Sequence, residues 1–204
     1  MTERNDFSGF LKERFSRYEA RRADPPAGTA RAAVVLVLRA GEIQPEALFV
    51  VRATHERDPW SGHVALPGGR EEQVDRDLMD TALRELHEET GLGLDRKEIV
   101  GRLDDLNPVS RHIPRIAISP FVAWRRRLAG VRRSAEIDGH FWVPVSELET
   151  PARRSSLTHR RDGDTFRFPT IEYDGHTVWG LTYSIVQNFL ELLGDTADRP
   201  TTGQ

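Results

Sequence analysis

The apolar positions at the start of the chain recur at helical spacing and predict an amphipathic helix over residues 6–22. These positions are Phe7, Phe10, Leu11, Phe15 and Tyr18. The segment 24–28, Asp-Pro-Pro-Ala-Gly, then breaks the helix and forms a linker. We therefore expect an N-terminal helix and linker, residues 1–28, that pack on their own chain, with a partner subunit as the alternative.

The hydrophobic pattern over residues 29–194 predicts one domain of mixed strands and helices. Apolar runs at 32–38 and 48–52 predict two strands, which form a hairpin-like pair with a long connection. Further strand-like segments lie at 97–106, 114–124 and 136–143. Strands stand before, between and after helices without regular alternation. This order favours an α/β sandwich with a mixed sheet over a doubly wound parallel sheet.

A central helix is predicted from about Asp77 to Thr90, shortly after a Gly-Gly turn. Asp75 or Asp77 is placed to cap its first turn, and Gly91 to follow its last. At about 100° per residue, three glutamates share one helix face beside an apolar stripe that can anchor the helix to a core. The glutamates are Glu85, Glu88 and Glu89, and the stripe is Met79, Ala82, Leu83 and Leu86. Such a face is either a solvated acidic surface or a site for a divalent cation.

The last part of the chain starts with a polar, arginine-rich segment at 151–163, which predicts a mobile loop. Alternation over 166–173 predicts a hairpin that turns at Pro169 or at Asp174-Gly175. The final elements expected are a C-terminal helix over 179–193 and a disordered tail over 195–204.

Composition is typical of a soluble globular protein, because charged residues make up 30% and hydrophobic residues 38% of the chain. The formal net charge of −3 gives no strong field that would attract nucleic acid. The absence of cysteine excludes disulfides, thiolate metal sites and a cysteine nucleophile. The charged start lacks the apolar core of a signal peptide, and no apolar run reaches transmembrane length. We therefore expect a cytoplasmic protein without nucleic-acid or membrane partners.

The glycine turn and the central helix resemble the Nudix box, G-x5-E-x7-R-E-U-x-E-E-x-G-U, in which U is a bulky aliphatic residue. Gly69 fits the first glycine, and segment 84–92, Arg-Glu-Leu-His-Glu-Glu-Thr-Gly-Leu, fits the second half without a gap. Asp75 stands where the first glutamate is expected, and eight residues rather than seven separate it from Arg84. The resemblance implies a Nudix α/β/α sandwich with a mixed sheet that hydrolyses a nucleoside diphosphate derivative.

The resemblance also implies roles for the residues of the box. The cofactor would be Mg²⁺, with Mn²⁺ also possible, held by the Gly68 carbonyl and by the carboxylates of Glu85, Glu88 and Glu89. Oxygen donors of this kind suit these hard cations. Glu85 would bind a second ion or help deprotonate the attacking water. Arg84, four residues before Glu88, would hold that glutamate by a charge-assisted bond, although an ordinary surface ion pair has the same spacing.

Outside the box, the resemblance implies a general base in the loop before the strand that ends near Val143. Glu136 is the first candidate and Asp138 its rival, and either could instead be a solvated loop acid. The residues that we expect to contact substrate are Arg52, Arg57, Arg111, His112, Arg115 and Trp179. Each also has an ordinary alternative, since arginines often lie on surfaces, and Trp179, like Trp60, could belong to a core or an interface.

A segment upstream of the box resembles the motif of the Nudix subgroup that cleaves coenzyme A, which is close to L-L-T-x-R-[SA]-x3-R-x3-G-x3-F-P-G-G. The matching positions are Arg52, Ala53 and Arg57. The spacer after Arg57 is one residue longer, and Val50 and Leu66 replace the expected threonine and phenylalanine. Segment 179–182, Trp-Gly-Leu-Thr, looks like the W-G-x-T of that subgroup. The resemblance implies coenzyme A or acyl-CoA as substrate, cleaved to 3′,5′-ADP and (acyl-)phosphopantetheine.

Two other functions stay open at this point. One is a different Nudix activity, on ADP-ribose, NADH, dinucleoside polyphosphates or modified nucleoside triphosphates. The other is a non-catalytic nucleotide-binding module on the same fold, which loss of the box carboxylates would mark; all of them are present. A homodimer is also possible, since the N-terminal helix or the arginine-rich segment could supply its contacts.

Overall fold

The computed structural model describes residues 7–54, 62–108, 115–161 and 164–194. Within them a central mixed sheet has the order β3-β2-β1-β6-β5, with β4 paired to β1 and β7 paired to β2. Only β1 and β6 run parallel; the other strand pairs are antiparallel in the described residues. The strands are β1 (Ala30–Ala40), β2 (Pro45–Arg52), β3 (Val64–Ala65), β4 (Gly68–Arg70), β5 (Ile99–Arg102), β6 (Ile116–Trp124) and β7 (Ile137–Pro144).

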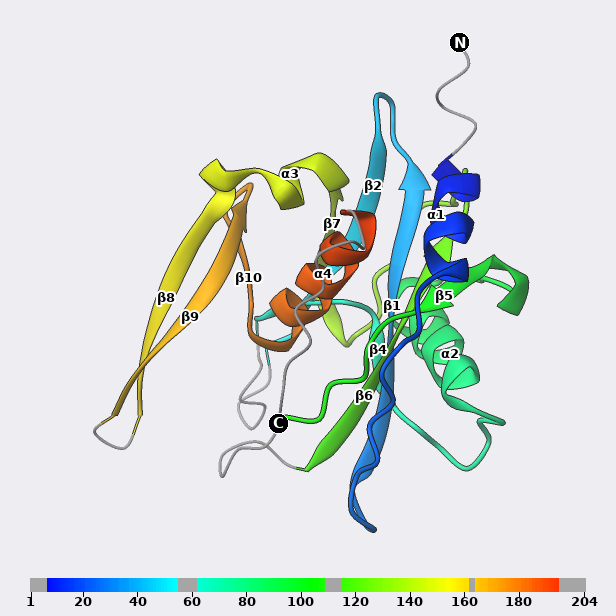
Figure 1. Ribbon diagram of the computed structural model, residues 1–204, viewed down its shortest axis with the longest axis horizontal. Coiled ribbons are helices and arrows are strands. Elements are labelled where there is room, and N and C mark those ends of the chain that lie inside the picture. The colour runs from blue at the N-terminus through cyan, green and yellow to red at the C-terminus, as the bar shows by residue number, and fades with distance from the viewer. Residues whose placement is uncertain (1–6, 55–61, 109–114, 162–163, 195–204) are drawn as a thin grey trace.

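Helices cover both faces of this sheet (Figure 1). They are α1 (Phe7–Ser16), α2 (Leu78–Thr90), α3 (Val145–Glu149) and α4 (Gly180–Leu193). Successive residues of β1 point to opposite faces, as the pleat of a strand requires. Ala33, Val35 and Val37 pack with α2, whereas Leu36 and Leu38 lie in the core beneath the other three helices. The α/β/α sandwich with a mixed sheet, flanked by N-terminal and C-terminal helices, is therefore confirmed.

Helix α2 begins and ends where its capping residues stand. The side chain of Asp77 accepts hydrogen bonds from the backbone N–H groups of Met79 and Asp80, both at 3.0 Å. At the other end Gly91 adopts a left-handed conformation with φ of 69°, and its N–H donates to the carbonyl of His87. A glycine enters this conformation without the steric cost that a Cβ adds. Of the two aspartates expected to cap the helix, Asp77 therefore does so.

The N-terminal segment leaves the helical conformation earlier than predicted, since α1 ends at Ser16 rather than near residue 22. Residues after Ser16 make tertiary contacts instead of continuing the helix. The hydroxyl of Tyr18 donates to Asp104 at 2.6 Å, and the backbone N–H of Arg21 donates to the same carboxylate at 2.9 Å. The ring of Phe15 covers Gly101, where any Cβ would come within 2.1 Å of it. These contacts hold the segment against β5, as expected for packing on its own chain.

Residues 151–163 are not the predicted loop, because most of them form strand β8 (Arg154–Arg161). This strand pairs with β9 (Asp164–Tyr173), which pairs with β10 (His176–Trp179) in a second, smaller sheet at one side of the molecule (Figure 1). The polar sequence of β8 has no alternation that would predict a strand, because this strand is stabilised by its pairing with β9. The chain turns at Asp174-Gly175, where both φ angles are positive, and Pro169 lies inside β9.

The connection between β1 and β2 also differs from its prediction. It is a tight turn rather than a long connection, closed by the hydrogen bond from the Gly41 N–H to the Gln44 carbonyl at 3.0 Å. Among the described residues, no helix is long and apolar enough to cross a membrane.

Candidate active site

The predicted Gly-Gly turn is instead a bend at Pro67 followed by Gly68 and Gly69 in strand β4, and we call residues 67–69 the glycine turn. It lies directly beneath helix α2. A Cβ on Gly68 would come within 2.3 Å of the carbonyl oxygen of Ala33, and one on Gly69 within 2.4 Å of the carboxyl carbon of Glu85. Two glycines therefore allow the turn to pass between β1 and the glutamates of the helix. The N–H of Gly68 donates to Oε2 of Glu89 at 3.1 Å, which ties the turn to the helix.

Glu89 is the most deeply buried carboxylate of the helix face, with only 3% of the residue exposed. Burial raises its pKa to about 8, and the negative charges of Glu85 and Glu136 act in the same direction. The hydrogen bond from Gly68 and the positive charge of Arg52 oppose the rise. Burial also raises the pKa of Glu85, against the influence of Arg84. A buried carboxylate surrounded by like charges is stabilised when it binds a proton or a cation.

The guanidinium of Arg84 contacts glutamates of the helix on one side and oxygens of Asp75 and Arg70 on the other. Its Nε and one terminal nitrogen bind both oxygens of Asp75 at 3.0 Å, in the bidentate geometry that arginine and carboxylate share. The same terminal nitrogen donates to the carbonyl of Arg70, and the other donates to Glu85 at 3.0 Å and Glu88 at 2.9 Å. The predicted contact with Glu88 is therefore one of several that fix the guanidinium.

Asp75 is the partner that the sequence left without a defined role. Its side chain is 3% exposed, and the hydrogen bonds from Arg84 lower its pKa to about 2. The hydroxyl of Thr81 and the N–H of Glu72 donate to the same carboxylate, each at 2.9 Å. The extra residue between Asp75 and Arg84 is accommodated without loss of the ion pair. Its place in the box was the signal for this role, but spacing alone did not identify the partner.

The segment before β7 is anchored to the end of α2. The N–H of Arg132 donates to the carbonyl of Thr90 at 2.8 Å, and the N–H of Ser134 donates to the carbonyl of Glu89 at 3.2 Å. These two hydrogen bonds hold the segment in a position that places Glu136 near the buried glutamates Glu85 and Glu89. Sequence reasoning missed this anchoring, because backbone hydrogen bonds leave no mark on residue type.

Glu136 and its rival Asp138 occupy different environments. Glu136 is exposed, and its charge raises the pKa of both Glu85 and Glu89, so its carboxylate lies within electrostatic reach of them. The carboxylate of Asp138 instead accepts hydrogen bonds from the N–H and the hydroxyl of Thr54, at 3.3 and 3.4 Å. The geometry therefore joins Glu136 to the carboxylate group of the helix.

The remaining residues expected to contact substrate are placed unequally. Arg52 ends β2 beside the site, since its charge acts on Glu89 and its N–H donates to the carbonyl of His63 at 3.0 Å. Trp179 packs against the ring of His63, with 4.9 Å between centroids. Arg115 is exposed at the start of β6, at the opposite end of the strand from Trp124. The positions outside the described residues are Arg57, Trp60, Arg111 and His112.

The donor set of the helix face is compatible with a hard divalent cation, because it consists of carboxylate and carbonyl oxygens. Within the described ranges, no three His, Cys, Asp or Glu side chains form a ready-made cage. The reason is that Arg84 draws the carboxylates of Glu85 and Glu88 toward itself, while Glu89 points to Gly68. Glu88 is half exposed and can turn, so a cation could compete with the arginine for it.

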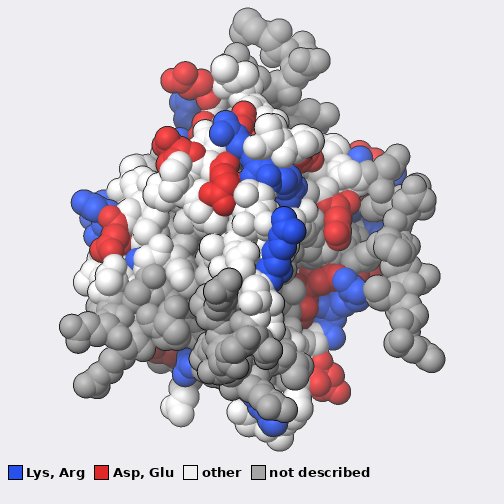
Figure 2. All heavy atoms as spheres, turned by 90° about the vertical axis from the view of Figure 1, so that its left-hand side faces the viewer, with Lys and Arg blue, Asp and Glu red and all other residues white. Residues whose placement is uncertain are grey.

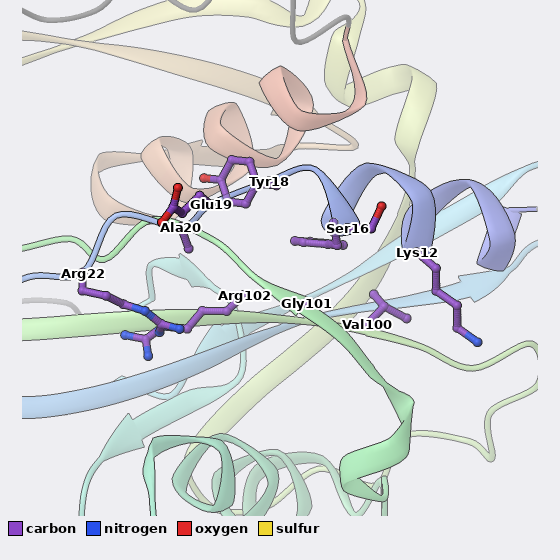
Figure 3. A pocket seen from close by; sticks show the side chains of 10 residues that line it. Lys12, Ser16, Tyr18, Glu19, Ala20, Arg22, Val100, Gly101 and Arg102 are labelled. Atoms are coloured by element: carbon purple, nitrogen blue, oxygen red, sulfur yellow. The ribbon is translucent and has the colours of Figure 1, made fainter.

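Two hollows lie elsewhere on the surface, along β5. The larger, of about 620 Å³, is bounded by α1, the segment after it and residues 100–102, and the second is about 410 Å³. Figure 3 shows the larger one, with the side chains of Arg22 and Arg102 at one end and Lys12 at the other. None of the glutamates of the helix face lines either hollow. The candidate active site is thus distinct from both.

Comparisons with known proteins agree with this geometry. A family model described as NUDIX domain matches residues 28–161. Two relatives are each described as "Uncharacterized Nudix hydrolase NudL", from Yersinia pestis (strain Pestoides F) and Yersinia pseudotuberculosis serotype O:1b (strain IP 31758). Each is 30% identical over 165 residues, which are 80% of this chain and 80% of the relative.

Solved structures share the fold. A MutT/nudix family protein from Enterococcus faecalis aligns with a TM-score of 0.58 and 17% identity, over 95% of this chain and 72% of the other. The NUDIX domain of Shewanella oneidensis NrtR, described as complexed with ADP ribose, aligns with a TM-score of 0.50 and 22% identity, over 74% and 89% of the two chains. The glycine turn beneath the glutamates of α2, together with the match of the family model, shows that the chain belongs to the Nudix family.

Proposed function

We propose that this protein is a Nudix hydrolase that cleaves the diphosphate of coenzyme A or an acyl-CoA, giving 3′,5′-ADP and (acyl-)phosphopantetheine. Membership of the family supports hydrolysis of a nucleoside diphosphate derivative. The observation that carries the catalytic part is the buried Glu89, whose pKa is raised to about 8 beside Glu85 and Glu136. A carboxylate in this environment favours a cation, which would also bind the oxygens of a diphosphate.

The proposed metal ligands are the Gly68 carbonyl, Glu85, Glu88 and Glu89, and the proposed ion is Mg²⁺, with Mn²⁺ as a substitute. When bound, the ion supplies positive charge that neutralises the diphosphate oxygens. The turn and helix α2 support this assignment, because the bond between the Gly68 N–H and Glu89 holds the backbone of the turn against the carboxylates. Arg84 would position the ligands through its bonds to Glu85 and Glu88.

Glu136 is the proposed general base. It is exposed at the rim of the buried carboxylates, so it can accept a proton from an attacking water and release it to solvent. The water oxygen forms a bond to one phosphorus, the bond from that phosphorus to the bridging oxygen breaks, and the other phosphate leaves with that oxygen. Arg52, beside Glu89, would hold the negative diphosphate during this step. Arg57, Arg111, His112, Arg115 and Trp179 stay proposed substrate contacts.

The coenzyme A part of the proposal rests on two segments that resemble the subgroup that cleaves coenzyme A. One lies before the box, around Arg52, and the other is segment 179–182. Arg52 and Trp179, one from each segment, both contact His63, so they belong to one continuous region. This arrangement supports a shared role in holding one substrate. The domain organisation proposed with it is an N-terminal helix and linker over 1–28, a Nudix domain over 29–194 and a tail over 195–204. A cytoplasmic location and a homodimer stay proposals of the same kind.

A substrate panel tests this function. The purified protein is incubated with Mg²⁺ and, in turn, coenzyme A, acetyl-CoA, ADP-ribose, NADH, a dinucleoside polyphosphate and an oxidised nucleoside triphosphate, and kcat/KM is measured by chromatography of the products. We expect 3′,5′-ADP from coenzyme A to form with the highest kcat/KM. If coenzyme A is cleaved more slowly than every other compound, a different Nudix activity replaces it. If none is cleaved, the protein is a binding module.

A further inference from the structure

We propose that one face of the small β8–β9–β10 sheet is a shelf for the acyl chain of the substrate, an inference that rests on the proposed cleavage of acyl-CoA. The shelf consists of Leu157, Phe166, Phe168 and Trp179. Leu157 on β8 is directly opposite Phe168 on β9, and Trp179 on β10 is directly opposite Thr170. Phe166, Phe168 and Thr170 alternate along β9, so all these positions share one face of the sheet.

Near Arg167 the other face of the hairpin carries polar side chains. Arg167 lies on it, between Phe166 and Phe168 in the sequence, and its Nε donates to the hydroxyl of Ser156 at 2.7 Å. Figure 2 looks onto the side of the molecule that carries the small sheet, and it shows basic and acidic side chains among other residues on this side. The hairpin is thus amphipathic, although its end projects from the body of the molecule (Figure 1). An exposed apolar face of this kind is typical of a binding surface.

The aromatic rings form a series of contacts that leads toward the candidate active site. The centroids of Phe166 and Phe168 are 6.4 Å apart, those of Phe168 and Trp179 are 5.6 Å apart, and the ring of His63 follows at 4.9 Å from Trp179. The carbonyl of His63 then accepts the N–H of Arg52, whose charge acts on Glu89. The shelf is therefore continuous, contact by contact, with the proposed diphosphate site.

The start of α4 fixes the distance between the shelf and the glycine turn. The hydroxyl of Thr182 donates to the carbonyl of Val64 at 3.1 Å, which holds the residues after Trp179 against β3. Gly68 is four positions after Val64 along the chain, so these two residues are at most about 14 Å apart. A long flexible chain attached to a diphosphate at the turn can reach a shelf that begins this close.

The shape of the row favours an aliphatic chain over a single stacked base. The rings of Phe168 and Trp179 are inclined by 58°, and those of Trp179 and His63 by 67°, so a base stacked on one ring does not stack on the next as well. Its length instead suits an extended chain that contacts ring edges and faces in turn. Phe166 is 43% exposed and Leu157 36% exposed, so the end of the shelf has apolar surface still to be buried.

A chain-length series tests the shelf. The kcat/KM of the wild-type protein is measured on coenzyme A and on its acetyl, butyryl, octanoyl and dodecanoyl thioesters. Burial of one methylene on a partly open surface is expected to raise kcat/KM by about twofold, so the value should climb with chain length and then level off where the shelf ends. The variants Phe166→Ser and Leu157→Ser should flatten the climb for the longest chains and leave coenzyme A unchanged. A flat series for the wild type would overturn the shelf.

The matched control is Ile43→Ser, which removes an 85% exposed apolar side chain in the turn between β1 and β2. It should leave the whole series unchanged, and a flattened climb in this variant would contradict the assignment to the hairpin. A second measurement separates the shelf from the proposed hydrolysis. Dodecanoyl-pantetheine, which lacks the diphosphate, is titrated by calorimetry into wild type and Phe166→Ser. Weaker binding of dodecanoyl-pantetheine to the variant supports the shelf, even if the protein does not cleave coenzyme A. Equal binding to both proteins rejects the shelf, even if the protein does cleave coenzyme A.

Discussion

Two buried carboxylates of the motif, Asp75 and Glu89, have opposite electrostatic properties. Asp75 receives two hydrogen bonds from the guanidinium, and its pKa falls to about 2. Glu89 accepts a hydrogen bond from the backbone N–H of Gly68, and burial raises its pKa to about 8. Ionised Asp75 therefore adds stability that is lost as the pH falls toward 2, whereas ionising Glu89 lowers stability as the pH rises toward 8.

This difference separates two halves of one motif. The half that contains Asp75 and Arg84 is satisfied within the protein, so it supports the site without needing a ligand. The half that contains Glu89 is under-compensated, and a cation would supply the missing positive charge. We therefore assign the paired charge of Asp75 to the structural support of the site and the uncompensated charge of Glu89 to its chemistry. Each prediction below changes one side of this comparison.

The largest effect should follow from Glu89→Gln. The variant removes the proposed ligand but keeps the shape of the side chain, so we expect hydrolysis to fall by at least about a thousandfold, equivalent to about 4 kcal/mol on the barrier. The fold should persist, because a neutral amide is less costly to bury than a carboxylate. Rates are measured on the best substrate of the panel, and Glu149→Gln, on the exposed side of α3, is the control. Retained activity would refute the assignment of Glu89 as a metal ligand.

The second effect concerns the scaffold. Arg84→Met leaves the buried Asp75 without its partner, so the free energy of unfolding should fall by about 3 kcal/mol, measured in urea. Arg76→Met is the matched control. It removes an exposed arginine that pairs with Asp80 four positions further along the chain, and such pairs contribute about 0–1 kcal/mol. Equal losses in the two variants would mean that the bidentate pair has no special structural role.

The contrast between these halves also explains what could be predicted from the sequence. Helix α2 was placed within one residue at its start, because Asp77 and Gly91 are local signals and the apolar stripe has a helical period. The two glycines mark the close approach beneath the helix, although they lie in strand β4 rather than in the predicted turn. The position of Glu136 depends on backbone bonds to Glu89 and Thr90, and strand β8 depends on pairing with β9, so neither geometry is encoded by a local pattern.

The third effect is stabilisation by the proposed cofactor. A ligand that binds only the folded state raises the free energy of unfolding, by about 1–3 kcal/mol at concentrations well above its Kd. We therefore expect millimolar Mg²⁺ to raise the melting temperature of the wild type, measured by calorimetry at pH 8 and constant ionic strength. Glu89→Gln should lose most of this shift, whereas Asp75→Asn should keep it. An equal shift in both variants would point to an unspecific effect of the salt.

The smallest effect should be a change in the pH dependence of stability. The pKa of Asp75 in the folded protein is about 2, below its ordinary value of 3.8, so protons bind the unfolded state first as the pH falls. The wild type should lose this part of its stability between about pH 4 and pH 2, and Asp75→Asn should lack that part of the slope. Asp77, Asp80 and Asp104 also have lowered pKa values, but their contributions are common to both proteins and cancel in the difference. Parallel unfolding curves from pH 5 to pH 2 would mean that Arg84 does not hold Asp75 in its charged form, and the division of the motif into a satisfied and an uncompensated half would then fail.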